Sequence, residues 1–394
     1  MSATVVKDAA SAPAARAWGK VWYAALGAGL VIGLSAFLYQ WANGLGVTGL
    51  SNTISWGMYI ITFMFLVGIS AGGLIVVAGS ELVGTDRFEP LEKLAVIVSG
   101  TAIAAAAISI LPDLGRPQLV WKMIWQPHWT SPLIWDVLVI TLYLSIAGLD
   151  LWFLTRPDVK RSRLRTMAFV ALPAAILVHS VTAWIFGLLV ARPFWNTAIL
   201  APMFISSALV SGTALVIFVT HVTDRTTAWH PPARVFADLG KLMVWFLAVD
   251  AFLLFAEILT TYASRVPDHL KQLDSLLFGR LAPVFWIEVL LGVVTPFAIF
   301  ASRLRERRGW VVAGALLALL GVFFKRINIV MTSMFLPLVG LGPGIPGGRP
   351  GQPFSPDPIY VPTVVEVGVL IGVASFVGLL ITLGVRTFVV PKQP

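Results

Sequence analysis

Ten long apolar runs constrain this chain more than any other feature of its sequence. A helix rises about 1.5 Å per residue, so roughly 20 apolar residues cross the ~30 Å hydrocarbon core of a bilayer. Of the 394 residues, 58% are hydrophobic and 12% are charged, whereas a soluble domain carries roughly 25% charged residues. We therefore expect an all-α integral membrane protein, because a helix pairs its own backbone groups in lipid. The runs lie at residues 21–41, 54–83, 91–111, 132–155, 166–190, 198–222, 235–263, 279–302, 309–331 and 360–388.

Basic residues gather in the loops that would lie on one side of the membrane. With both termini in the cytoplasm, seven of the 28 Lys and Arg residues fall outside, two fall within a predicted helix, and the remaining 19 stay inside. Short cytoplasmic loops are enriched in Lys and Arg. We therefore expect a multi-pass protein of the inner membrane with both termini in the cytoplasm. This bias accounts for the net charge of +9 and gives no reason to expect a nucleic-acid partner.

The composition also bounds the redox groups that this protein can hold. It has no cysteine, so it offers no thiolate to an iron–sulfur cluster. A haem held by two histidines needs them at matching depth on facing helices, but His179 lies in the middle of a predicted helix and His221 at the end of the next. We expect no haem, iron–sulfur cluster or other metal in this chain.

Ionisable residues interrupt several of the apolar runs. A charge at the centre of a bilayer costs at least ~2.5–3.5 kcal/mol, so each one needs a reason. Acids and bases could pair only to fix helix packing, they could relay protons, or they could line the path of a transporter. Their spread over several helices and depths favours a relay modestly. The candidates for a proton pathway are Glu81, Asp136, Asp150, His179, Asp250, Glu257 and Glu288.

The segment between the third and fourth predicted helices carries the strongest chemical signal. Asp113 and Arg116 follow the third helix, and His128 lies among Trp residues before the fourth. Asp113 and Arg116 could pair at the membrane surface; alternatively, Asp113 and His128 could exchange protons with a quinone ring. Quinone chemistry needs a proton donor or acceptor near each ring oxygen, and an apolar slot. The Trp and Pro residues of 112–131 are typical of an aromatic belt or of a surface that docks a partner.

Short motifs spread along nearly the whole chain carry a family resemblance. They are Ser55-Trp56-Gly57, Asp113-Leu114-Gly115-Arg116-Pro117, Trp129-Thr130-Ser131-Pro132, His179-Ser180-Val181-Thr182-Ala183-Trp184, Trp286-Ile287-Glu288, Arg326-Ile327-Asn328 and Tyr360-Val361-Pro362-Thr363. Together they resemble the NrfD/PsrC family of membrane subunits. The length and the ten predicted helices resemble its long branch, which includes the HybB type and the subunits of alternative complex III.

The resemblance implies a fold of two four-helix bundles flanked by the first and last helices. It divides the chain into a cytoplasmic N-terminus with the first helix (1–50), a first bundle with a quinone site (51–192), a second bundle (193–335), and an external loop with the last helix (336–394).

The resemblance also implies a function in a complex. The chain would be the quinone-binding subunit of a respiratory oxidoreductase, exchanging electrons between menaquinone or ubiquinone and a ferredoxin-like 4Fe-4S subunit. That subunit would serve a molybdopterin or other catalytic subunit, and some long members are proposed to translocate protons. A stand-alone transporter or ion pump and a passive membrane anchor are the alternative functions.

Family positions can be carried onto this chain residue by residue. The short polysulfide-reductase branch has Asn and His near the start of the second helix, where this chain has Tyr59 and Phe63. The catalytic candidates are Asp113, Arg116 and His128, and the candidates to line the quinone slot are Trp56, Tyr59 and Trp129.

Overall fold

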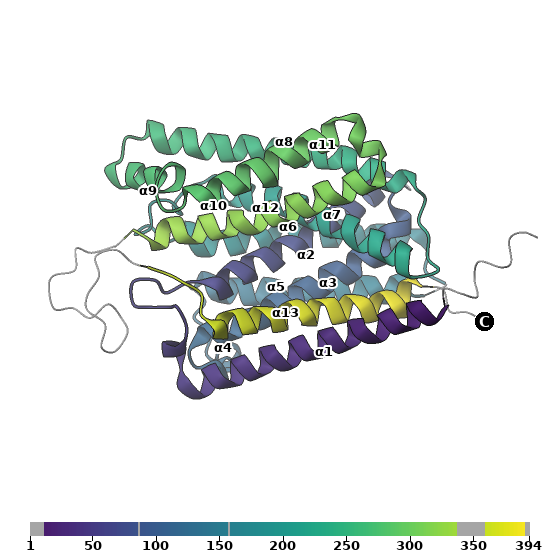
Figure 1. Ribbon diagram of the computed structural model, residues 1–394, viewed down its shortest axis with the longest axis horizontal. Helices are drawn as coiled ribbons and strands as arrows, with labels where there is room; N and C mark the ends of the chain where they lie inside the picture. Colours follow the sequence, from purple (N-terminus) through teal and green to yellow (C-terminus); the bar gives the residue numbers. More distant parts are fainter. Residues whose placement is uncertain (1–11, 86, 157, 337–358, 391–394) are drawn as a thin grey trace, which may run out of the picture.

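The computed structural model describes residues 12–85, 87–156, 158–336 and 359–390. Within these residues, ten helical segments are long and apolar enough to cross a membrane, and they run side by side along the long axis of the molecule (Figure 1). The predicted all-α membrane fold is confirmed. The spanning segments are α1 (Ala12–Asn43), α2 (Met58–Val83), α3 (Glu92–Ser109), α5 (Pro132–Leu154), α6 (Arg161–Gly187), α7 (Leu200–Thr226), α8 (Arg234–Ala263), α10–η5–α11 (Ala282–Ala301), α12 (Arg308–Met334) and α13 (Val364–Gly384).

The spanning helices pack as two groups of four and one pair. In the first group, α2, α3, α5 and α6 form a ring of contacts. In the second, α7, α8, the α10–α11 segment and α12 form another. Helix α2 also contacts α7 and α12 and so joins the groups. Helices α1 and α13 pair with each other, and α13 rests on α3 (Figure 1).

Glycines let the helix backbones touch at the crossings. A Cβ atom added to Gly33 of α1 would lie 2.3 Å from Cα of Gly372 in α13. A Cβ atom added to Gly72 of α2 would lie 1.8 Å from the carbonyl oxygen of Ala208 in α7. Without a hydrophobic drive between helices in lipid, such close approach supplies the packing that holds them together.

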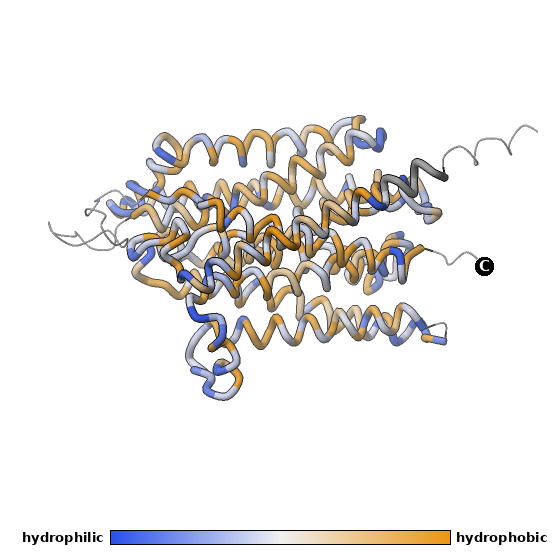
Figure 2. The backbone as a smooth tube through the Cα atoms, turned by 60° about the horizontal axis from the view of Figure 1, so that its bottom comes forward, coloured by the Kyte–Doolittle hydropathy of each residue, from blue (hydrophilic) through white to orange (hydrophobic). Residues whose placement is uncertain are grey.

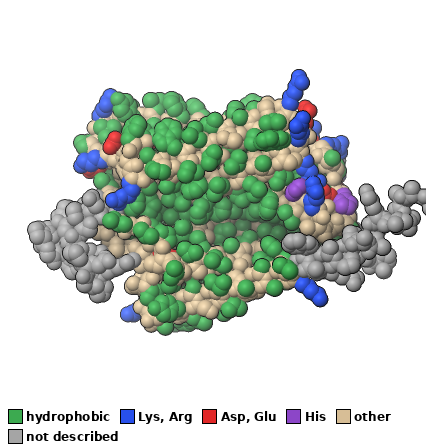
Figure 3. Space-filling view, viewed as in Figure 1, with side chains coloured by type: hydrophobic (Ala, Val, Ile, Leu, Met, Phe, Trp, Pro, Cys, Tyr) green, Lys and Arg blue, Asp and Glu red, His purple; other side chains and the backbone are tan. Residues whose placement is uncertain are grey.

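The polar residues mark two ends of an apolar band. Hydrophobic residues fill the middle of the tube in Figure 2, and Lys and Arg lie near both ends of the face drawn in Figure 3. Helix α1 starts and the π-helix η7 (Val385–Val389) finishes at the same end, named here the terminal end. The opposite end, named the α4 end, carries the short helices α4 (Lys122–Trp125) and α9 (Pro267–Leu277).

Parts of the predicted termini and of the predicted external loop are not described. Residues 1–11, 337–358 and 391–394 lie outside the described residues. Which end faces the cytoplasm stays a prediction from the charge bias.

Candidate functional site

A buried acid oxygen at the α4 end has no partner within the described part of the chain. Asp113 lies in the 3-10 helix η3 (Leu111–Leu114), which follows α3. Its Oδ1 atom is buried and makes no hydrogen bond there. Buried polar atoms are nearly always hydrogen-bonded, so an orphaned carboxyl oxygen needs an explanation. A ligand that offers a proton donor or a polar hydrogen would supply one.

Two side chains from neighbouring helices fix the backbone beside Asp113. The Gln40 side chain of α1 donates from Nε2 to the carbonyl oxygen of Pro112 at 2.6 Å. The Tyr59 hydroxyl of α2 in turn donates to Oε1 of Gln40. Gln40 and Tyr59 are both buried. This series of bonds joins α1, α2 and η3 around the acid.

A second buried carboxylate, Glu366 at the start of α13, ties the same region together. It accepts hydrogen bonds from the backbone N–H of Gly49 at 2.7 Å and of Thr363 at 2.9 Å, and from the Tyr360 hydroxyl at 2.6 Å. Burial and the Glu366 carboxylate raise the pKa of Tyr360, so its hydroxyl stays protonated and keeps donating. Glu366 and Asp113 are close enough to interact electrostatically.

An apolar groove of about 170 Å³ runs between α1, α3 with η3, and α13. All three walls belong to membrane-spanning segments. Leu111 and Pro112, the two residues before Asp113, form part of the wall. Asp113 therefore directly follows two residues of the groove wall within the membrane band. The other lining residues are Leu30, Gly33, Leu34, Phe37, Ile108, Val369, Gly372, Val373 and Phe376.

Comparison with known proteins places the chain in a family. A family model described as "Polysulphide reductase, NrfD" matches residues 46–337. The chain belongs to the NrfD family.

Relatives of this NrfD protein match along most of their length. A proposed membrane subunit of a dimethyl sulfoxide reductase from Halobacterium salinarum is 35% identical over 93% of this chain and 91% of that protein. An Hdr-like menaquinol oxidoreductase integral membrane subunit of Archaeoglobus fulgidus is 25% identical over 92% of each. One of the chains of the polysulfide reductase from Wolinella succinogenes is 23% identical over 71% of this chain and 94% of that protein.

The family match does not include the whole groove. Residues 46–337 run from η1 (Leu45–Val47) to just beyond α12. Helices α1 and α13, which form two of the three groove walls, lie outside this range. The NrfD region thus supplies Asp113 and Tyr59. Helices α1 and α13 supply Gln40, Glu366 and most of the apolar lining.

The other predicted quinone-site residues of this NrfD protein, apart from Tyr59, are exposed or contact other side chains. Arg116 and His128 are exposed, and His128 Nδ1 lies 2.9 Å from the Thr130 hydroxyl. Trp129 is 65% exposed. Trp56 stacks on Trp195, with ring centroids 5.3 Å apart, and Trp195 donates to the carbonyl oxygen of Ile329 in α12. Among the described residues, no hydrogen bond or ion pair joins any of these four to Asp113.

The predicted acids of the first group lie in two places. At the terminal end, Glu81 and Asp150 line a small cavity together with Glu92, a residue that the sequence analysis missed. Nearer the α4 end, Asp136 accepts a hydrogen bond from the Thr182 hydroxyl at 2.7 Å. His179 is buried on α6, with Nδ1 3.2 Å from the carbonyl oxygen of Ala175.

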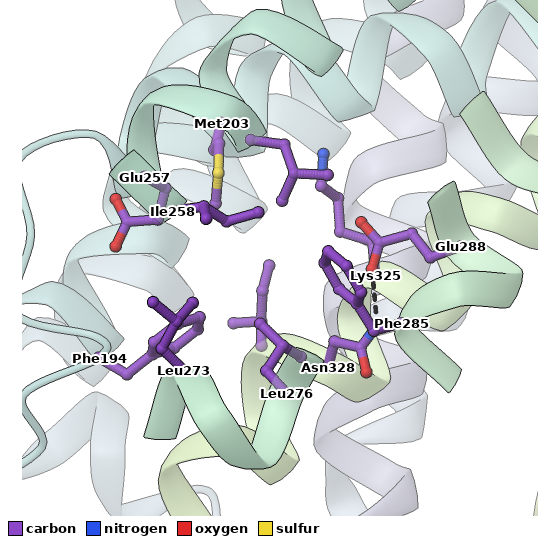
Figure 4. A pocket seen from close by; sticks show the side chains of 12 residues that line it. Phe194, Met203, Glu257, Ile258, Leu273, Leu276, Phe285, Glu288, Lys325 and Asn328 are labelled. Carbon is purple, nitrogen blue, oxygen red and sulfur yellow. Dashed lines mark hydrogen bonds between the residues drawn. The ribbon is translucent and has the colours of Figure 1, made fainter. Parts of the chain in front are cut away.

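The predicted acids of the second group have polar partners on α12 or on the connection between α6 and α7. Asp250 pairs with Lys325 at 2.6 Å. Glu288 accepts a hydrogen bond from Nδ2 of Asn328 at 2.6 Å, drawn dashed in Figure 4. Glu257 accepts one from the Thr197 hydroxyl at 3.1 Å.

Gln40, Glu92 and Tyr143 are polar residues that the sequence analysis missed. Tyr143 is fully buried, lies 2.7 Å from the Ser99 hydroxyl, and donates to the carbonyl oxygen of Ser70. Each of the three is a polar residue within or beside a long apolar run. The same feature, a polar residue in an apolar run, marked the predicted acids. If Gln and Tyr had been included in that search, Gln40 and Tyr143 would have been found.

Proposed function

We propose that this chain is the quinone-reacting membrane subunit of a respiratory oxidoreductase complex. One observation carries the proposal: the Oδ1 atom of Asp113 is buried without a hydrogen-bond partner among the described residues, and Asp113 directly follows Leu111 and Pro112 in the wall of an apolar groove between α1, α3 and α13. A membrane quinone combines an apolar tail with ring oxygens that gain or lose protons. The groove suits the tail, and the carboxyl suits a ring oxygen. The menaquinol oxidoreductase subunit among the relatives supports this assignment.

In the proposed reaction, Asp113 exchanges a proton with the nearer ring oxygen. Oxidation of a quinol releases two electrons and two protons, and reduction of the quinone takes up the same number. Gln40 and Tyr59 are positioning residues, because their hydrogen bonds hold Pro112 and hence the backbone of η3. The Oδ1 atom of Asp113 is buried, and a hydrogen bond to the ring oxygen is stronger away from bulk water.

We propose that a ferredoxin-like 4Fe-4S subunit docks at the α4 end and carries the electrons to a molybdopterin or other catalytic subunit. The chain has no cysteine, so the two electrons need an acceptor or donor elsewhere. Trp121, Ile124, Trp125 and Trp129 are exposed at this end. Aromatic side chains of this kind are enriched in protein interfaces, and they are equally typical of an aromatic belt at the membrane surface.

Proton translocation is a second proposed function of the buried polar groups. The acids of both groups lie within spanning segments and at different depths, as in the proton relays of membrane pumps. Tyr143, Ser99 and Ser70 provide hydroxyl groups between the two sets of acids in the first group. These contacts support a path for protons between the terminal end and the α4 end.

Replacing Asp113 by Asn tests the quinone proposal in the intact complex. The change keeps the shape of the side chain and removes its proton exchange, which is worth on the order of 100-fold or more in rate. We expect quinone turnover to fall by at least that factor, while the partner subunits still co-purify. Asp268→Asn on the exposed first turn of α9 is the control and should keep normal turnover. Normal turnover in the Asp113 variant would refute a role for this acid.

The same preparation separates the alternative functions. A passive anchor predicts that no point change in the groove alters quinone turnover while the complex stays assembled. A stand-alone transporter predicts solute movement in vesicles that contain this protein without any redox partner.

A further inference from the structure

The terminal end of the second group carries far more positive than negative charge. Residues 221–241 hold the end of α7 and the start of α8, and residues 301–310 hold the end of α11 (Thr295–Ala301) and the start of α12. Together these two stretches contain seven Lys and Arg residues and three acids. Figure 3 shows Lys, Arg and His side chains gathered at this end of the drawn face.

Two of the three acids are already occupied by other bases. Asp224 pairs with Arg308 of α12, and Asp238 pairs with Lys241 at 3.2 Å. Glu306 is exposed and is the third acid. The acids of these stretches therefore leave most of the positive charge uncompensated.

Four arginines carry this uncompensated charge, and each comes from the end of a different spanning segment. All four are exposed, and none forms an ion pair with an acid of the described chain. One lies in the last turn of α7, one begins α8, one lies two residues beyond α11, and one directly precedes α12. They are Arg225, Arg234, Arg303 and Arg307, and are named here the arginine surface.

Contacts between the segments bring these helix ends together. The 3-10 helix η6 (Arg303–Glu306) contacts α8. A Cβ atom added to Gly240 of α8 would lie 3.7 Å from Cβ of Arg305. At the start of α12, Arg308 donates to His221 of α7 at 2.9 Å. The arginine surface is therefore one region at the terminal end of the second group.

The arginine surface lies at the depth of lipid head groups. Each of its residues is within two positions of the end of a spanning segment, and the connection between α11 and α12 is short. Trp310, in the first turn of α12, is 45% exposed, and Trp is enriched where the hydrocarbon meets the head groups. Phe297 of α11 is 38% exposed on the apolar side, where acyl chains would lie.

We propose that the arginine surface binds the head group of an anionic phospholipid, such as phosphatidylglycerol. A guanidinium group matches a phosphate with two parallel hydrogen bonds, and basic sites between spanning helices bind anionic head groups. A zwitterionic lipid has no net charge, and its ammonium group would meet the same arginines. A lipid is favoured over an acidic protein segment because these arginines adjoin the hydrocarbon and do not project from the membrane on a long loop.

Native mass spectrometry of the whole complex tests this proposal after its lipid has been removed in a mild detergent. Phosphatidylglycerol should bind more tightly than phosphatidylcholine with the same acyl chains. In the double variant Arg303→Gln with Arg307→Gln, the affinity for phosphatidylglycerol should fall about fivefold for each arginine removed. The affinity for phosphatidylcholine should not change. Arg225→Gln with Arg234→Gln should act in the same way, and serves if the first double variant fails to assemble.

A matched control removes the same charge from the first group. Arg156→Gln with Arg163→Gln changes two exposed arginines where α5 ends and α6 begins, and should keep the affinity of the wild type. Equal losses in the control and in the test variants, or equal affinity of the wild type for the two lipids, would overturn the proposal. So would loss of a partner subunit with unchanged lipid binding, because an acidic protein would then occupy the surface.

Discussion

Glu366 joins the last helix to the site through four hydrogen-bond donors. It accepts from two backbone N–H groups, from the Tyr360 hydroxyl and, at 3.4 Å, from the Thr363 hydroxyl. In Glu366→Gln, an amide NH₂ group takes the place of one carboxylate oxygen. It then faces one of the groups that donated a hydrogen bond to that oxygen. An unsatisfied buried group costs about 1–3 kcal/mol, so we expect a lower melting temperature for the purified complex. Glu306→Gln, at an exposed position, should melt like the wild type, and equal melting of both variants would contradict the prediction.

The sequence predicted part of the candidate site, and the missing part depends on contacts between distant segments. Asp113 stood out because an acid follows an apolar run beside Trp and Pro residues. Gln40 did not, because a single Gln near the end of a run has no visible partner until α1 lies against η3. The sequence motif around Trp56 likewise does not reveal which neighbour its ring meets. In the structure these neighbours are Phe186 and Trp195 rather than the groove.

At the level of elements, the α1–α13 crossing determines the shape of the groove. Gly33 and Gly372 line the groove and touch each other across the crossing. In Gly33→Ala, the added methyl group pushes α1 away from α13, and overpacking of this kind costs about 1–3 kcal/mol. We expect a lower melting temperature and a reduced quinone turnover in the purified complex.

Gly27→Ala is the matched control for that change. It lies on the same helix, and an added Cβ atom meets nothing within 4 Å. Ala is also the better helix former by about 1 kcal/mol. The stability of the Gly27→Ala variant should therefore equal or exceed that of the wild type. Similar losses in both variants would mean that helix propensity, and not the crossing, explains the effect.

The apolar runs predicted all ten spanning segments because lipid imposes length and hydrophobicity on every one of them. They did not predict the π-helix η5 (Glu288–Val294) within the α10–α11 span. A π-turn adds one residue to a turn without changing composition, so hydropathy cannot detect it. The close contact of Gly292 with Gly321 of α12 belongs to this segment and depends on the fold around it.

In the whole molecule, Arg326 lies where the two groups of helices meet. It binds Ser207 of α7, interacts electrostatically with Asp250 and Glu288, and also acts on His179 of α6 in the first group. A Cβ atom added to Gly68 of α2 would lie 3.4 Å from its Nη2 atom. One buried guanidinium therefore interacts with ionisable groups of both groups of helices.

The direction of the molecule in the membrane decides which side supplies protons to the Asp113 site, and the lack of native cysteine in this chain allows a direct measurement. Ser162 lies at the terminal end, at the start of α6, and Lys271 lies on α9 at the α4 end; both are exposed. Because loops rich in Lys and Arg stay in the cytoplasm, a membrane-impermeant maleimide should label Lys271→Cys in intact spheroplasts and Ser162→Cys only after the membrane is opened. The opposite pattern would invert the orientation and place the Asp113 groove near the cytoplasmic surface. The proposed iron–sulfur partner would then have to dock from the cytoplasm.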